Sequence, residues 1–260
     1  SLVAQNGAKY TTANLGYYAK KIDKNSKILL IDLDFNNPTL CFHYTKNFVH
    51  NIDDLVPLQN KLNKELLLER IAKTNLGFDV LKGTTIKNEE YISAELIAKI
   101  LILAKELYTH VFVVTSPNFN NPNVMITLLN SDKIILVLRN NYTNELCFTN
   151  FLEDISLYLK DNIIVNTIFN YRDYSHDLNI TKKANKKNNI KINHLGFLDY
   201  DNKTVKCPLE NREEVTSKLW KRLYSESQMV GEAIDSMYFK AYDAYEYANM
   251  CKREKSNKIE

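Results

Sequence analysis

Hydrophobic residues along this chain fall into short apolar runs that are separated by longer stretches with helical spacing. The runs have the length of strands buried on both faces, and they lie at residues 27–33, 78–81, 111–114, 133–138, 163–165 with 167–169, and 194–198. Between them, apolar residues recur every three or four positions, which predicts helices at about residues 11–24, 61–73, 92–107, 122–130, 144–160 and 209–225. Strands that alternate with helices form right-handed β-α-β units. We therefore expect a three-layer α/β fold, in which helices cover both faces of a mostly parallel sheet.

The segments that follow the strands are the places to look for a ligand site, because parallel α/β sheets bind ligands beyond the carboxyl ends of their strands. Residues 1–3 are barely long enough for a first strand, and "AQNGAKYTTANLG" follows at residues 4–16. The other such segments are "DLDFNNPTL" at residues 32–40, "FNYR" at 169–172 and "LGFLDYD" at 195–201.

Composition indicates an ordinary folded chain. The 260 residues are enough for one large α/β domain, which we predict at residues 1–225, followed by a C-terminal helical extension at 226–260. The formal net charge of +3 is too small to imply a polyanionic partner. Four widely separated cysteines without a C-x-x-C pair indicate free thiols in a reducing compartment. No apolar run is long enough to span a bilayer and no signal peptide is visible, so we expect a cytoplasmic protein that reaches a membrane only peripherally, through partners.

An ordered set of short motifs carries a family resemblance. The motifs are "ANLG", "KILLIDLDFNNPTL", "FDVLKG", "IFNYR" and "LGFLDYD". In this order they resemble the ParA/MinD superfamily of deviant P-loop ATPases, over most of residues 1–205. The pilus-positioning CpaE/TadZ-like branch and the bacterial tyrosine-kinase branch are the nearest. The resemblance implies a P-loop NTPase-like fold with a deviant Walker A loop.

The phosphate loop departs from the family pattern. The positions that the resemblance assigns to nucleotide binding are Gly7, Ala8, Lys9, Tyr10 and Thr11. With the spacing anchored on Asn14, Ala8 stands at the phosphate-binding Lys and Lys9 at the magnesium-binding Ser/Thr. A phosphate cradle needs glycines that let backbone N–H groups approach the anion, and a Lys that neutralises it. A register shifted by one residue would instead make Lys9 the phosphate-binding Lys, at the expense of the spacing to Asn14.

The acidic positions are partly retained. The resemblance implies that Asp32 supports the water shell of a magnesium ion and that Asp34 orients the attacking water, which makes both vestigial candidates for catalysis. Val114 stands where the family has a later Asp, and Asn170 corresponds to an adenine-contacting Asn. The alternative is that the two carboxylates simply end a strand and cap a loop. We expect binding of ATP and magnesium to be weak or lost, with very slow or no hydrolysis.

Two features further along the chain suggest docking surfaces. Lys182, Lys183, Lys186 and Lys187 would share one helical face that suits a DNA backbone or an acidic partner. The alternative is a solvated helix face. In the C-terminal extension, an aromatic stripe that includes Tyr238, Tyr242 and Tyr245 suits a docking or dimerisation helix. The alternative is a terminal helix that packs on its own domain.

These observations favour a non-catalytic or weakly catalytic scaffold. Through a protein partner or a homodimer, it would position or assemble a larger machine such as a pilus, secretion or partition apparatus. One alternative is an active ATPase for DNA partition or cargo positioning that uses Lys9 in the shifted loop. A further alternative is a tyrosine-kinase-like protein with a degenerate phosphate loop.

Overall fold

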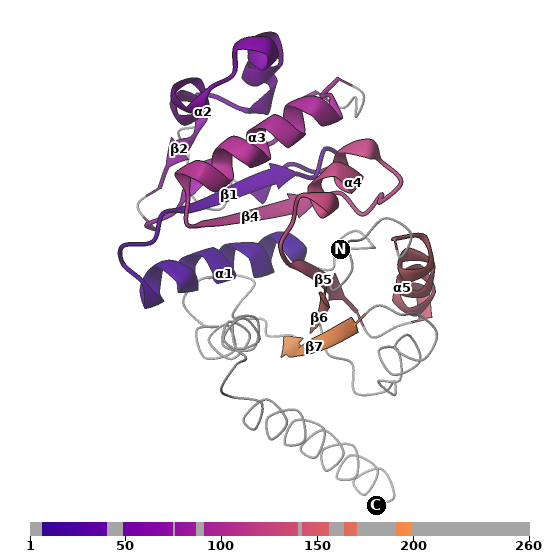
Figure 1. Cartoon of the computed structure of the whole chain (residues 1–260). Coiled ribbons are helices and arrows are strands. Elements are labelled where there is room, and N and C mark those ends of the chain that lie inside the picture. The colour runs from indigo at the N-terminus through magenta and orange to yellow at the C-terminus, as the bar shows by residue number, and fades with distance from the viewer. Residues whose placement is uncertain are drawn as a thin grey trace, which may run out of the picture.

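The structure, a computed structural model, describes residues 7–40, 49–74, 76–86, 91–139, 142–155, 164–170 and 191–198. Its elements in chain order are α1 (Ala8–Ile22), β1 (Ile28–Leu33), the 3-10 helix η2 (Ile52–Lys61), α2 (Lys64–Arg70), β2 (Ala72–Lys73), β3 (Asp79–Leu81), α3 (Ala94–Leu107), β4 (His110–Thr115), α4 (Pro122–Leu129), β5 (Ile134–Leu138), α5 (Tyr142–Ile155), β6 (Ile164–Asn170) and β7 (Lys191–Leu198) (Figure 1). All six strands predicted from the apolar runs are present.

The strands are mostly parallel, as predicted. Four of them form a sheet in the order β2-β3-β1-β4, and the other three form a sheet in the order β5-β6-β7. Only the short β2 runs antiparallel to its neighbour, β3. The prediction of an α/β fold is thereby confirmed, although the described strands form two hydrogen-bonded sheets and not a single one.

β1 divides its side chains between two helical layers. Because successive residues of a strand point to opposite faces, the odd-numbered residues from Leu29 to Leu33 share a core with α3. The even-numbered Ile28 and Leu30 pack instead with α1. Figure 1 shows these two helices on opposite sides of β1 and β4. The same alternation assigns Asp32 to the face that α1 covers, which brings the first turn of α1 and the end of β1 to one site.

The three-stranded sheet has a core of its own. Aliphatic residues of β5, among them Leu136 and Leu138, pack against three fully buried side chains of α5, namely Phe148, Phe151 and Leu152. This core holds β6 in place, and β6 ends at Asn170, one of the predicted site residues.

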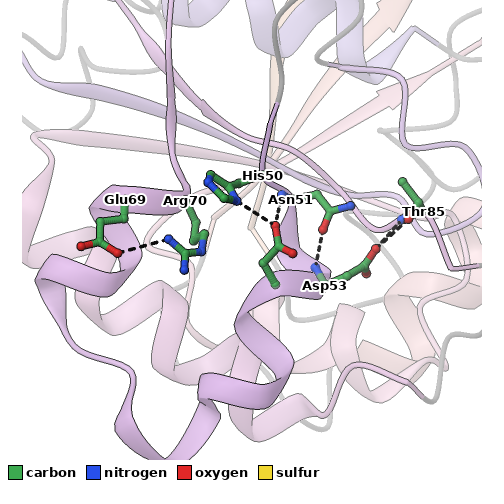
Figure 2. Close-up of polar contacts among 7 residues, drawn as sticks. His50, Asn51, Asp53, Glu69, Arg70 and Thr85 are labelled. Carbon is green, nitrogen blue, oxygen red and sulfur yellow. Dashed lines mark hydrogen bonds and ion pairs between the residues drawn. The ribbon is translucent and has the colours of Figure 1, made fainter.

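Two local features differ from the predictions. The helix predicted at residues 61–73 is too long, because α2 ends at Arg70 and the chain then becomes extended and forms β2. The 3-10 helix η2 precedes α2 and was not predicted. Its first turn carries a capping box, in which Asn51 Oδ1 accepts from Asp53 N at 2.9 Å and Asp54 Oδ2 accepts from Asn51 N at 3.0 Å. In Figure 2, Asp53 also accepts hydrogen bonds from Thr85, which ties this turn to the loop after β3.

Several predictions fall on parts of the chain outside the described residues. They are the first strand with Val3, the helix at residues 209–225, the domain boundary at 225/226, the lysine cluster of residues 182–187 and the tyrosine stripe of residues 238–245. These stay predictions.

Candidate functional site

The first turn of α1 forms one wall of the candidate site. Gly7 is the N-cap of α1 and has a φ of 87°, in the left-handed region that glycine adopts with little strain. Its carbonyl oxygen accepts from Thr11 N at 2.9 Å and from Thr11 Oγ1 at 3.0 Å. The turn that follows brings Ala8, Lys9 and Tyr10 together, and Asn14 Nδ2 donates to Tyr10 O at 2.8 Å. The predicted loop residues are therefore the beginning of a helix.

Asn170 lies directly against this turn. It is the last residue of β6 and is 2% exposed. Gly7 approaches it so closely that a Cβ at position 7 would overlap Asn170 Nδ2. The structure thus brings together two residues that the sequence predicted separately, one as the last glycine of the phosphate loop and the other as the adenine contact.

Asp32 anchors the loop that follows β1. Its side chain is fully buried, Oδ1 accepts from Asp34 N at 3.1 Å, and Oδ2 accepts from Leu40 N at 2.8 Å. Burial raises the pKa of Asp32 to about 6, against the opposing effect of the Lys9 charge and of these two backbone donors. Both carboxylate oxygens are therefore used to shape the loop from residue 34 to residue 40.

Asp34 is paired with Lys9. The ammonium Nζ of Lys9 donates to Asp34 Oδ2 at 2.6 Å and also to the carbonyl oxygen of Asn37. The Lys9 and Asp34 side chains are 15% and 16% exposed, so the pair is largely shielded from water. Asp34 Oδ1 in turn accepts from Asn37 N at 3.3 Å. Lys9, which the resemblance assigns to the position of a magnesium-binding hydroxyl, thus carries an ammonium that binds one of the two acids.

The arrangement does not fit a magnesium ion. Magnesium takes oxygen ligands in a near-ideal octahedron. Here Asp32 binds backbone N–H groups, Asp34 binds Lys9, and the residue of β4 in register with Asp32 is the buried Val114. Within the described residues, no group of three or more His, Cys, Asp or Glu could hold a metal ion.

The fit to ATP is partial. A left-handed glycine and a helix N-terminus without a side-chain cap are retained at Gly7. Ala8, however, carries no charge where the resemblance requires a Lys to neutralise phosphate. The first turn of α1 carries a positive charge at Lys9, and that charge is already paired with Asp34.

A cavity of about 500 Å³ lies next to this turn. It is lined by the first half of α1, by β4 and β5, and by Ser116. Ser116 is 1% exposed, and its Oγ has no hydrogen-bond partner among the described residues. Sequence reasoning missed Ser116, and it also missed Asn37 and Leu40. The one feature of the sequence that could have identified these three residues is their position, because each lies in a segment that directly follows a strand.

No protein-family model matches this sequence, and no curated protein matches it. Solved structures nevertheless share its fold. A ParA family ATPase from Chlorobium tepidum matches with a TM-score of 0.69 at 14% identity, over 88% of this chain and 96% of that chain. The MinC:MinD cell division protein complex from Aquifex aeolicus matches with a TM-score of 0.65 at 17% identity, over 86% and 93%. MinD complexed with Mg-ADP from Pyrococcus horikoshii matches with a TM-score of 0.62 at 15% identity, over 88% and 94%.

At these identities the likeness establishes the fold. The predicted ParA/MinD-like, P-loop NTPase-like fold is confirmed, whereas the branch and the loss of catalysis stay predictions. In the part of the chain that the structure describes, no helix is both long and apolar enough to cross a bilayer.

Proposed function

We propose that this chain is a non-catalytic or weakly catalytic protein of the ParA/MinD fold that positions or assembles a larger cellular machine through protein–protein contacts. The machine is a pilus, secretion or partition apparatus. One observation carries the proposal: the Lys9–Asp34 ion pair, at 2.6 Å, engages the carboxylate that would have to orient an attacking water.

The chemistry of phosphoryl transfer supports this proposal. Catalysis of that reaction consists almost entirely of positioning the phosphate and neutralising its charge. Ala8 contributes no charge, the ammonium of Lys9 is committed to Asp34 and Asn37, and Val114 contributes no carboxylate. A site with these residues retains the architecture of a nucleotide pocket but few of the groups that lower the barrier.

A role through protein contacts agrees with one of the structural relatives. The Aquifex aeolicus MinD of similar fold was solved as a complex with MinC. For this chain we propose a protein partner or a second copy, docked through the tyrosine stripe of residues 238–245. Binding of DNA through the lysine cluster of residues 182–187 is a weaker proposal, because the net charge is only +3.

Titration with labelled ATP, with and without magnesium, together with a turnover assay, tests the proposal. We expect binding far weaker than that of an intact ParA/MinD ATPase and no hydrolysis above background. Turnover that Asp34→Asn abolishes would contradict the proposal, because it would require a working carboxylate at this position. Asp132→Asn is the matched control, since the Asp132 side chain is 85% exposed in a surface pair with Lys105.

A working ATPase is the second candidate, and the position of Lys9 favours it. Lys9 lies in the first turn of α1, and its ammonium already points into the site. In this alternative, Lys9 would leave Asp34 and bind phosphate when nucleotide enters. Lys9→Ala would then abolish turnover. If the protein is instead non-catalytic, there is no turnover for this change to reduce.

A further inference from the structure

Two carboxylates, those of Asp32 and Asp34, lie close together at the end of β1. Together they require a positive charge nearby. Asp32 is fully buried, and the Asp34 side chain is 16% exposed. Neighbouring acids that are both shielded from water raise each other's energy unless a cation lies between or beside them. A divalent metal ion is one such cation, because magnesium and calcium take carboxylate oxygens as ligands.

Lys9 meets this requirement from the facing helix. Its Nζ lies 2.6 Å from Asp34 Oδ2 and contacts the carbonyl oxygen of Asn37. A carboxylate and a backbone carbonyl are the kinds of oxygen that a hard cation binds. The Lys9 charge also lowers the pKa of Asp32 against the effect of burial, so the ammonium acts on both acids.

We infer that the ammonium of Lys9 is the resident cation of this site and excludes a divalent metal ion from the carboxylates that follow β1. The loop from residue 34 to residue 40 is folded around this cation. Asp34 Oδ1 accepts from Asn37 N at 3.3 Å, Asp32 Oδ2 accepts from Leu40 N at 2.8 Å, and Lys9 binds both Asp34 and the carbonyl oxygen of Asn37. A metal ion would have to displace the ammonium and open this loop.

This inference shares the Lys9–Asp34 ion pair with the proposed function, but it concerns metal exclusion in the absence of nucleotide. The probe is therefore Mn²⁺ alone, added to the full chain. The readout is paramagnetic broadening of the backbone amide signals of Asp34, Asn37 and Leu40. For the wild-type protein we expect no selective loss of these three signals at Mn²⁺ concentrations on the order of 10⁻³ M, the weak end of carboxylate sites.

Lys9→Ser removes the ammonium and restores a hydroxyl. We expect this variant to gain Mn²⁺ binding, seen as selective loss of the same three signals, and the double variant Lys9→Ser/Asp34→Asn to lose it again. Lys20→Ser is the matched control, because Lys20 lies in the same helix and its Nζ donates to the carbonyl oxygens of Lys24 and Ser26. The carboxylate on which its charge acts is that of Asp23, which is not part of the site. Lys20→Ser should leave the spectrum in Mn²⁺ unchanged.

Two results would overturn the inference. One is selective broadening in the wild-type protein that Asp34→Asn removes, since Lys9 would then coexist with a metal ion. This measurement needs no change at Lys9 and remains decisive even where Lys9→Ser does not fold. The other is a folded Lys9→Ser variant that shows no selective broadening. Neither result bears on turnover, so the proposed function would stand or fall separately.

Discussion

Gly7 and Asn170 lie in different halves of the sequence, yet they are in contact at the N-terminus of α1. The position of Gly7 is demanding in two ways, because its φ of 87° disfavours a side chain and Asn170 leaves no room for one. The sequence identified both residues through the family motifs, but their contact depends on how the two sheets are arranged. Spacing along the chain carries no such information.

Gly7→Ala should therefore destabilise the fold by more than backbone strain alone. We expect about 1–2 kcal/mol from the left-handed conformation, and about 1–3 kcal/mol more from overlap with Asn170. Gly77→Ala is the control, because Gly77 has a φ of 85° but its Cβ would meet only the Lys20 side chain. Urea unfolding of both variants is measured together with that of Asn170→Ala and of Gly7→Ala/Asn170→Ala, which gives the overlap as a coupling energy. Equal losses for the two glycines would contradict the contact.

Asp32 predicts a pH dependence. Its folded pKa of about 6 lies above the ordinary value of 3.8, so the folded state binds more protons than the unfolded state between these values. The contribution of Asp32 to the free energy of unfolding should thus fall as the pH rises through this range, by about 2 kcal/mol between pH 4.5 and pH 7 at 1.4 kcal/mol per pKa unit. In Asp32→Asn this fall should disappear. Urea unfolding at pH 4.5 and pH 7 checks the difference between variant and wild type, and an opposite slope would show that Asp32 is stabilised in its charged form.

At the scale of elements, the apolar runs predicted the strands well because strands buried on both faces need continuous aliphatic residues. β2 escaped notice because two residues carry no periodicity, and its pairing with β3 depends on the hairpin-like return of the chain. η2 escaped notice because Pro57 interrupts its helical pattern. Its one local signal was the pair of capping residues, Asn51 and Asp54.

The packing of α3 gives a clear contrast between two isoleucines that lie on different faces of this helix. Ile100 is 1% exposed in the core shared with β1, whereas Ile102 is 53% exposed. Ile100→Ala should lower the free energy of unfolding by about 2–5 kcal/mol, and Ile102→Ala should change it by no more than about 0.5 kcal/mol. Urea denaturation midpoints measure both. A large effect at Ile102 would mean that the exposed face of α3 is covered by a partner.

For the whole molecule, the family motifs predicted the fold correctly, because most of them overlap a strand and their order along the chain is the order of those strands. The Lys9–Asp34 pair could not be predicted from the sequence, for a physical reason. The motif spacing assigned Lys9 a position in the helix, but the partners of its ammonium, Asp34 and Asn37, lie in a loop whose path cannot be read from spacing along the chain.

Assembly offers a test at this scale. The resemblance implies that intact relatives dimerise around two nucleotides, with a signature Lys that reaches across to the other subunit. Val3 stands at that position in this sequence. We therefore expect any dimer to form without nucleotide. Light scattering with and without ATP checks this, and a monomer that becomes a dimer only when ATP is added would refute it.

The alternation along β1 also limits how this chain can change. Leu29, Ile31 and Leu33 pack in the core beneath α3, whereas the intervening Ile28 and Leu30 pack with α1. Asp32 lies on this second face, at the site. A single inserted or deleted residue in β1 would exchange the two sets, moving the carboxylate into the aliphatic layer beneath α3 and aliphatic side chains into the site. A substitution in the first turn of α1 leaves both layers in register, although at Gly7 a side chain would overlap Asn170. Substitutions can thus remove catalytic groups from the site one by one, whereas the length of β1 has to stay constant.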